Sequence, residues 1–490
     1  MAIRSLAFPF TILFLVNILF FLAVIFESPG EENIRGQILL TVSSREFVGA
    51  QLFGSAVVEV GQTNQSTVND LEELYSHTLQ FGKLDDTGTY LILSHVITAL
   101  DQKTFANDVL CVGVQASVDQ LHKLPEFVAT WPGAISLAVF APGVEFFLAI
   151  AYVHHLRTCF PQIKSQVTWH FAFPTEVRGN ASDASLAREI SAGRCDELGP
   201  KEVLERLLQT QGTEEAQQVL KNKRSNHEMP YPQNLMRNVA RQHCLSEWVV
   251  CPDIDMLFPR PNPQMEPSLA AGLSEFLRSP EATDCGKCAF VLPLYELEHP
   301  NRTLPGDKDE LLAFVARGWA QQYHKEVFAQ NQAASQLQKW QKRAEKRRVR
   351  LAYKVSFQMW YEPIYVARQG SPKFDERYVG YGMTRNTQAY EMSLAGYSFH
   401  LLDSIFLSHV WGLKRKTAVE SNTERKIETQ MNTRFFSSVH VRELAARYDS
   451  DRHNILRYQK RSNKNYNIVM NTRAPEIKSI KSSGKYTNVI

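Results

Sequence analysis

The sequence has little net charge for its length. Its 490 residues include 54 Lys and Arg against 51 Asp and Glu, which gives a formal net charge of +3. So small an excess creates no long-range field that would draw the whole chain to nucleic acid or to a membrane surface. We therefore expect no nucleic-acid partner, and binding partners have to be sought at individual sites.

The sequence also has few cysteines, and they form no complete metal-binding pattern. Cys285-Gly-Lys-Cys288 has no second CxxC and no nearby histidine pair that would make a zinc site. We expect a local disulfide or structural thiols at these two positions. The total of seven cysteines is odd, so at least one is left free or pairs with another chain.

The first 26 residues differ from the rest of the chain. Ser5 to Phe26 is uncharged and rich in Leu, Ile, Val and Phe, which is long enough to cross a bilayer. Arg4 precedes this run and acidic residues follow it, so the positive-inside rule places the N-terminus in the cytosol. The sequence predicts a retained signal anchor over 1–26 and a lumenal body. A cleaved secretory signal is the alternative.

The remaining chain divides into three predicted parts. Residues 27–88 suit a lumenal stem, 89–450 a folded domain, and 451–490 a basic, disordered tail. Three tripeptides are N-glycosylation acceptors in a secretory compartment, namely those that begin at Asn64, Asn180 and Asn301.

The folded part alternates between strand-like and helix-like segments. Strands are predicted at Tyr90–Leu93, Ile135–Phe140 and Val167–Phe173, and helices at 143–158, 200–222, 266–279 and 333–350. The strands are apolar on both faces, which is typical of buried strands in a largely parallel sheet. We predict an α/β fold. The helix at 333–350 is strongly basic, and a solvated face is favoured over a patch for acidic glycans or nucleic acid.

The stretch from Tyr231 to Phe258 contains the most informative chemistry. A helix-like segment ends at Arg241, and the apolar strand that begins at Trp248 leads into Asp253-Ile-Asp255. Two carboxylates at the carboxyl end of a buried strand can bind a divalent cation that neutralises a diphosphate. An isolated Asp-X-Asp is weak evidence, because it occurs often by chance.

An ordered set of motifs resembles glycosyltransferase family 49. The motifs occur between Tyr90 and Ala445 and comprise Trp131–Phe140, Asn234–Arg241 followed by Asp253-Ile-Asp255-Met256, Cys288–Glu296, Tyr361–Pro363, Phe374–Gly382 and Phe406–His409. The resemblance implies a GT-A-type nucleotide-binding domain in a Golgi type II membrane protein. It further implies inverting, manganese-dependent transfer from a UDP-sugar to a glycan acceptor on a glycoprotein.

The resemblance also implies roles for single residues. Asp253, Asp255 and His409 match the manganese ligands, and a neutral imidazole suits that ion beside carboxylates. Lys414 resembles a lysine that meets the pyrophosphate; because the spacing is one residue short, Arg415 and Lys416 stay open as alternatives.

Two further sets of candidates come from reaction chemistry and spacing. Inverting transfer needs a base for the acceptor hydroxyl, and Asp375 or Glu376 is predicted to serve, with one of them paired to Arg377. The adjacent Gly380 and Gly382 would permit a close approach of the backbone to a ligand. Arg237 and Arg241 share a helix face and point either to phosphate and the Asp-X-Asp or to solvent.

The donor and acceptor follow from the resemblance alone. It favours transfer of glucuronic acid from UDP-glucuronic acid to a xylose-terminated O-mannosyl glycan of the dystroglycan type, with Arg377 or Arg385 as partners of the sugar carboxylate. Transfer of N-acetylglucosamine is a second enzymatic alternative. A catalytically silent, glycan-binding Golgi protein is the third, and membership of a Golgi enzyme complex or a homo-oligomer also stays open.

Overall fold

The computed structural model describes residues 82–456, apart from 102–106, 144, 178–194, 196–197, 211–229, 264–266, 345–346 and 415–422. Contacts divide the chain into Met1–Val58 and Glu59–Ile490, and all described residues belong to the second unit. The predicted anchor, most of the stem, Asn64, Asn180, Arg415, Lys416 and nearly all of the tail lie outside these ranges. Within them, no helix combines the length and the apolar character that a bilayer crossing requires.

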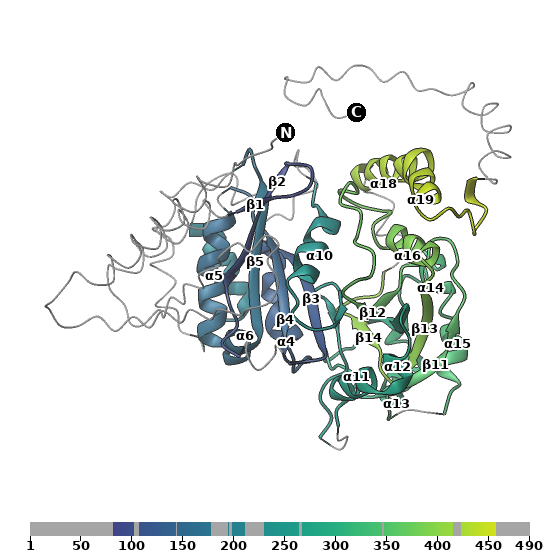
Figure 1. Ribbon diagram of the computed structural model, residues 1–490. Helices are drawn as coiled ribbons and strands as arrows, with labels where there is room; N and C mark the ends of the chain where they lie inside the picture. Colours follow the sequence, from purple (N-terminus) through teal and green to yellow (C-terminus); the bar gives the residue numbers. More distant parts are fainter. Residues whose placement is uncertain are drawn as a thin grey trace, which may run out of the picture. The chain divides into compact units, whose positions relative to one another are not determined.

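The strands are distributed over two sheets (Figure 1). Their bounds are β1 Lys83–Leu84, β2 Tyr90–Ile97, β3 Leu110–Ser117, β4 Ile135–Phe140, β5 Val167–Pro174, β6 Trp248–Val250, β7 Met256–Leu257, β8 Cys288–Leu292, β9 Leu294–Leu297, β10 Ala320–Gln322, β11 Arg350–Val355, β12 Ile364–Arg368, β13 Ser398–Asp403 and β14 Leu407–His409. The larger sheet has ten strands in the order β1-β2-β5-β4-β3-β6-β12-β8-β13-β11, and the smaller has the order β10-β9-β14-β7. The larger sheet begins at Lys83, inside the segment predicted as stem.

The larger sheet is mixed and not largely parallel as predicted. Strands β5, β4, β3 and β6 form a parallel block, but β12 runs antiparallel to both β6 and β8. Burial on both faces does not distinguish parallel from antiparallel strands, because β8 is fully buried although its neighbour β12 runs antiparallel to it. A mixed α/β fold with one large sheet still fits a GT-A-like glycosyltransferase.

The helices surround these sheets and connect their strands. They are α4 Leu124–Val128, α5 Glu145–Cys159, α6 Pro161–Gln166, α8 Pro200–Thr210, α10 Gln233–Gln242, α11 Leu269–Arg278, α12 Pro280–Thr283, α13 Lys308–Ala316, α14 Gln330–Ala333, α15 Leu337–Gln341, α16 Arg385–Leu394, α18 Thr423–Phe435, α19 Val441–Arg447, the 3₁₀ turn η1 Val118–Lys123 and the π turn η4 Phe436–His440. The helices predicted at 143–158 and 266–279 are confirmed as α5 and α11. That at 200–222 is seen as α8 up to Thr210.

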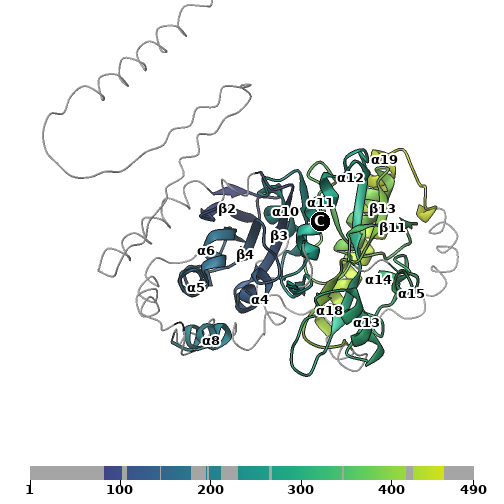
Figure 2. The same cartoon turned by 90° about the horizontal axis from the view of Figure 1, so that it is seen from below.

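The parallel block lies between α5 on one face and α10 on the other (Figure 2). Side chains alternate along β4, so Leu137 and Val139 pack with α5 in the main core, whereas Ala138 and Phe140 pack with α10. Each fully buried Leu, Val or Phe contributes about 1.5–3 kcal/mol. Gly113 on β3 lets α10 approach closely, because a Cβ there would lie 3.3 Å from the Arg241 amide nitrogen. The core therefore fixes α10 against the end of the parallel block.

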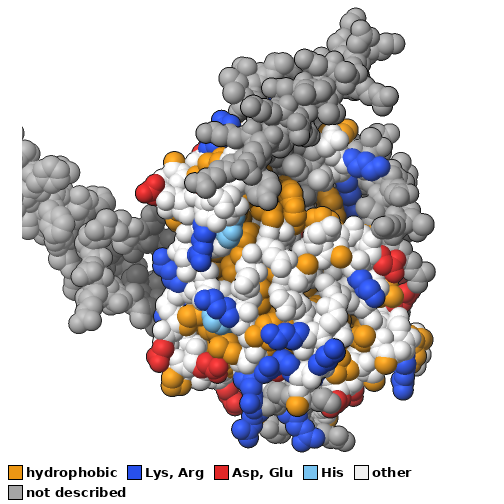
Figure 3. Space-filling model, turned by 90° about the vertical axis from the view of Figure 1, so that its right-hand side faces the viewer, with side chains coloured by type: hydrophobic (Ala, Val, Ile, Leu, Met, Phe, Trp, Pro, Cys, Tyr) orange, Lys and Arg blue, Asp and Glu red, His pale blue; other side chains and the backbone are white. Residues whose placement is uncertain are grey.

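The basic segment 333–350 is not one helix. It contains the short α15, which follows Gln336 in a left-handed conformation with φ 47°, and ends where β11 begins. Trp340 is fully buried and donates from Nε1 to the Leu402 carbonyl at 3.0 Å, which fixes this turn to β13. Exposed basic side chains lie on α15, on β11 and between them, and Figure 3, viewed from their side of Figure 1, shows Lys and Arg side chains gathered on that face.

Three disulfides close loops in the described chain. They are Cys111–Cys244, Cys159–Cys195 and Cys285–Cys288, and the buried Cys251 stays free. The expectation of a local bridge in the CxxC is confirmed. The Cys111–Cys244 bridge joins β3 to the end of α10 and so reinforces the packing around Gly113.

Candidate active site

Asp253 and Asp255 lie between β6 of the larger sheet and β7 of the smaller. The parallel neighbour β3 lies beside β6, so both carboxylates stand at the carboxyl end of the parallel block. Strand β14 pairs with β7 and sets His409 opposite Met256, and the Val410 amide donates to the Asp255 carbonyl at 2.9 Å. The smaller sheet thus brings the distant His409 to the Asp-X-Asp.

The Asp253 carboxylate is held by three donors at one oxygen. Its Oδ1 accepts from Arg385 at 2.6 Å, from Gln115 at 3.0 Å and from Arg237 at 3.3 Å. Burial alone would raise the pKa of Asp253, but Arg385 and Arg237 outweigh it and hold the pKa below its ordinary value. Asp253 is therefore ionised at neutral pH. All three bonds end on Oδ1, which leaves Oδ2 for a further ligand.

The Asp255 carboxylate faces two basic side chains. Its Oδ2 lies 3.0 Å from Lys123 Nζ and 3.7 Å from His409 Nε2. Lys123 reaches it from the end of η1, which follows β3 directly. Burial lowers the pKa of His409, so the ring is neutral and presents a lone pair, as a metal ligand must.

The donor chemistry of this edge fits a divalent cation. It offers two carboxylates and an imidazole, and His409 Nδ1 is buried without a hydrogen-bond partner. The possible ligand atoms of His95, His170 and His243 lie within 4.8 Å of one another. In the described structure, those of Asp253, Asp255 and His409 are farther apart than this. In this structure Lys123, Arg237 and Arg385 form salt bridges with the two carboxylates.

A row of polar side chains continues from His409 across the smaller sheet. The rings of His409 and Tyr323 are 5.3 Å apart, and Lys414 Nζ donates to His324 Nε2 at 2.9 Å. Burial, and then Lys414, lowers the pKa of His324 to about 3, so this imidazole is neutral. Lys414 is close enough to the Asp-X-Asp edge to interact electrostatically with Asp255 and Asp253, and its role at the pyrophosphate stays a prediction.

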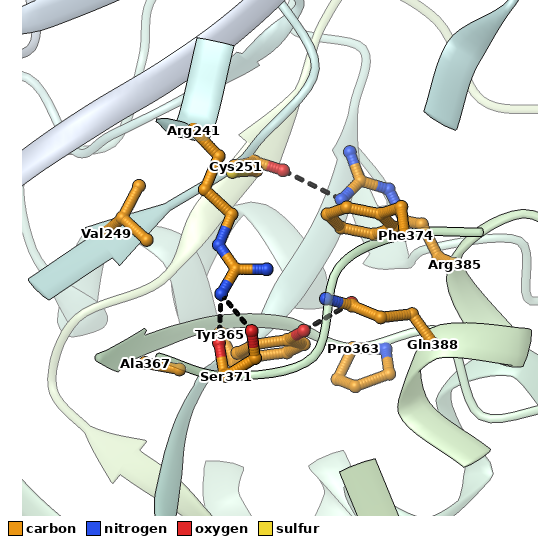
Figure 4. A pocket seen from close by; sticks show the side chains of 10 residues that line it. All are labelled: Arg241, Val249, Cys251, Pro363, Tyr365, Ala367, Ser371, Phe374, Arg385 and Gln388. Atoms are coloured by element: carbon orange, nitrogen blue, oxygen red, sulfur yellow. Dashed lines mark hydrogen bonds between the residues drawn. The ribbon is translucent and has the colours of Figure 1, made fainter. Parts of the chain in front are cut away.

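Arg237 and Arg241 have separate surroundings although they share α10. Arg237 is buried and reaches Asp253, whereas Arg241 donates to the carbonyls of Gln369, Ser371 and Pro372. Arg241 and Arg385 border a cavity of about 20 Å³ that Figure 4 shows from close by. Because a water molecule needs about 10–15 Å³, this cavity suits one water and not a sugar nucleotide. Arg241 thus binds the loop at 369–372, whereas Arg237 is the one of the two that pairs with the Asp-X-Asp.

The two predicted base residues lie on a loop that is fastened to α10 and α19. Asp375 pairs with Arg377 at 2.6 Å, and Arg377 also pairs with Glu443 at 2.6 Å. This confirms that one carboxylate orders the loop. Glu376 accepts from the buried Asn238 at 2.7 Å, and burial raises its pKa. Both carboxylates thus have structural partners.

The nearby glycines of this loop face helix α18. Gly380 and Gly382 have φ +75° and +86°, and a Cβ at either would meet α18, at Glu428 or Thr429 respectively. Of the predicted glycosylation acceptors, only Asn301 is among the described residues, and it is exposed.

Four residues at this edge were not found from the sequence. Gln115 and Lys123 come from the end of β3 and the turn after it, and the rule that ligands bind at the carboxyl ends of parallel strands could have marked them. Tyr323 and Glu362 come from the smaller sheet and from the segment before β12, and only the Tyr361–Pro363 motif pointed to one of them.

A family profile and three relatives are similar in sequence to this chain. Residues 109–449 match the profile of glycosyltransferase family 49, described as glycosyl-transferase for dystroglycan. β-1,4-Glucuronyltransferase 1 of Homo sapiens is 30% identical over 370 residues, which cover 75% of this chain and 81% of that protein. The protein of the same name from Danio rerio is 27% identical over 369 residues, or 74% and 80%.

A third relative matches a shorter stretch. The xylosyl- and glucuronyltransferase LARGE1 of Homo sapiens is 29% identical over 183 residues, which cover 37% of this chain and 22% of that protein. The family match spans more than two thirds of the 490 residues and nearly the whole described fold. The chain belongs to glycosyltransferase family 49.

Proposed function

We propose that this protein is an inverting, manganese-dependent GT-A glycosyltransferase that transfers glucuronic acid from UDP-glucuronic acid to a xylose-terminated glycan, such as an O-mannosyl glycan of the dystroglycan type. The observation that supports it best is the meeting of Asp253, Asp255 and His409 at the carboxyl end of the parallel block. Two relatives that cover three quarters of the chain are named β-1,4-glucuronyltransferase 1.

The residues at this edge would have separate roles in the reaction. Asp253 Oδ2, Asp255 and His409 would hold Mn²⁺, which supplies positive charge to the departing diphosphate when it is bound. Lys123 and Lys414 would add charge from the protein, Lys123 beside Asp255 and Lys414 beside His324. Gln115, which accepts from the Tyr231 hydroxyl, would hold Asp253 in place.

Arg385 is the better of the two predicted partners for a sugar carboxylate. Its guanidinium lies 2.6 Å from Asp253, whereas Arg377 is paired with Asp375 and Glu443 on the loop fastened to α19. A guanidinium presents several donors in a fixed plane, so Arg385 can bind Asp253 and a second carboxylate together.

One observation favours a second candidate, a catalytically silent glycan-binding protein. Both carboxylates of the Asp-X-Asp already have cationic partners, two arginines at Asp253 and Lys123 at Asp255. Such pairing would keep the edge stable in the absence of a metal ion.

The two candidates differ in a direct assay. The detergent-solubilised full chain is incubated with a panel of UDP-sugars and Mn²⁺ on xylosides and lactosamines, and product is measured by mass spectrometry. The proposal predicts glucuronic acid transfer to xylosides that EDTA abolishes and Mn²⁺ restores. Transfer that survives EDTA contradicts the metal site. The absence of transfer from every donor, with retained glycan binding, supports the silent protein.

The proposal also includes the compartment, with residues 1–26 as the anchor of a type II Golgi membrane protein. Asn301 is exposed on the described domain and would face the lumen. The expected result in cells is carbonate-resistant membrane association and a glycan at Asn301 that Asn301→Gln removes. A domain released by carbonate, or an unmodified Asn301, would contradict this orientation.

A further inference from the structure

The proposed transfer needs a base at the acceptor side, and neither predicted candidate is well placed for it. The charged groups that shift the pKa of Glu376 are Asp86, Asp85 and Lys373, near the β1–β2 turn and in its own loop. Asp375 is held by Arg377 and lies 3.3 Å from His440 Nε2. Both carboxylates are thus surrounded by residues that hold the loop, so a third carboxylate is needed.

We infer that Glu362, in the segment just before β12, is the catalytic base of the transfer. The inference rests on the proposed function and assigns one step of it. Strand β12 pairs antiparallel with β6, with Val366 opposite Val250. Because β6 ends at Val250 and β12 begins at Ile364, Glu362, just before β12, and the Asp-X-Asp, just after β6, lie at the same end of this pair of strands.

The electrostatic surroundings of Glu362 are those of the active-site edge. Arg385, Arg237 and Asp253 all act on its carboxylate, and it acts in turn on the phenols of Tyr323 and Tyr381. Tyr381 is 40% exposed and Glu362 itself is partly exposed, so solvent reaches this part of the edge. Glu362 thus lies near the candidate metal ligands and is accessible to an acceptor.

The backbone around Glu362 is fixed on both sides. Tyr361 and Pro363 are buried, and Tyr361 shares a hydrogen bond of 2.7 Å with Ser335. The Glu362 amide donates to the Asn331 carbonyl and its carbonyl accepts from Gln332 Nε2, both at 2.9 Å. These bonds to α14 hold the backbone of the segment in place. The partly exposed side chain of Glu362 is then the group of this segment that can react.

Among the described residues, the Glu362 side chain has one neutral hydrogen-bond partner and no salt bridge. Asn331 Nδ2 lies 3.4 Å from Glu362 Oε2 and 2.9 Å from His324 Nδ1, and the other nitrogen of His324 meets Lys414. Burial raises the pKa of Glu362 above its ordinary value, which strengthens it as a base. A carboxylate locked by arginine, such as Asp375, is the weaker base.

The step balances without any co-reactant. Glu362 takes the proton of the acceptor hydroxyl, the hydroxyl oxygen forms the new bond to C1 of the sugar, and the bond from C1 to the diphosphate breaks. The electron pair of that bond leaves with UDP, and attack from the opposite face inverts C1. Glu362 then releases its proton to solvent, so the products are glycoside, UDP and one proton.

The test compares Glu362→Gln with two other amide variants in the full chain. Glutamine keeps the shape but cannot take a proton. We expect kcat for transfer to fall by about 10²–10⁴-fold, while UDP binding with Mn²⁺ stays within about twofold and the acidic fall of the wild-type pH–rate profile disappears. Glu326→Gln, an exposed change on the same stretch of chain, serves as the matched control and should leave kcat unchanged.

The outcomes separate this inference from the proposed function. If Glu376→Gln abolishes transfer and Glu362→Gln does not, the base is Glu376 and the inference is wrong. If Glu362→Gln weakens UDP binding as much as it lowers kcat, the residue binds the donor and the inference is also wrong. If the wild-type chain transfers no sugar while it binds UDP, the proposed function itself fails.

Discussion

This chain has two candidate pairs of carboxylates, Asp253 with Asp255 for a metal ion and Asp375 with Glu376 for the base. In the first pair, Arg385 and Arg237 bind one oxygen of Asp253 and leave the other for a ligand. In the second, Arg377 binds both oxygens of Asp375 and reaches Glu443 as well. A carboxylate that arginine binds through one oxygen can still bind a ligand through the other. A carboxylate that arginine binds through both oxygens instead holds the structure together.

Of the substitutions that test this comparison, Asp255→Asn is expected to have the largest effect on the rate of transfer. The amide keeps the size of the side chain but loses the charge that faces Lys123 and His409. We expect transfer to fall by roughly 10²–10³-fold, as for loss of one electrostatic contact to the transition state. Initial rates at saturating Mn²⁺ measure it, with Tm as the check on folding. Near-normal rates would mean that Asp255 does not bind the metal ion.

Much of the framework of this site could be predicted from the sequence. The strands at Ile135–Phe140 and Val167–Pro174 and the helix α10 follow from local apolar patterns, and the Asp-X-Asp lies at the predicted strand end. Such features depend on neighbours a few residues away, which is why periodicity finds them.

The partners of the carboxylates could not be predicted in the same way. Arg385 reaches Asp253 from α16, which contacts β12 through the hydrogen bond from Tyr365 to Gln388. Strand β12 returns antiparallel to β6, and the expectation of a largely parallel sheet does not include that return. The local pattern of the basic segment 333–350 predicts a helix. This is wrong, because the burial of Trp340 and the pairing of β11 with β13 decide its structure. Long-range pairing carries no local signal.

A second, intermediate effect is expected from Arg385→Ala. Arg385 is mostly buried, so its loss leaves Asp253 with Arg237 and Gln115 and should lower the free energy of unfolding at pH 7 by roughly 3 kcal/mol. Arg385 contributes to holding the pKa of Asp253 below its ordinary value of 3.8. That stabilisation is present above the unfolded pKa and is lost as pH falls through the folded pKa.

The difference between wild type and Arg385→Ala should therefore shrink on acidification below about pH 4. Urea unfolding at pH 7 and at a series of lower pH values down to about pH 2 measures this difference. Arg442→Ala, an exposed change on α19, is the matched control and should shift stability by less than about 0.5 kcal/mol at each pH. A gap between wild type and Arg385→Ala that does not depend on pH would show that Arg385 stabilises by packing and not through Asp253.

The smallest effect is expected from Arg377→Ala, in the second pair. Arg377 is 41% exposed, and exposed pairs contribute little, so the two bridges to Asp375 and Glu443 together should stabilise by about 1 kcal/mol. Asn238 still holds the Phe374 carbonyl and amide at 2.7 and 3.0 Å, which keeps the loop on α10. Transfer should stay within about threefold of wild type, measured at equal donor saturation. A loss of about 100-fold with an unchanged Tm would break the comparison, because the loop of Asp375 would then take part in the reaction and not merely fasten it.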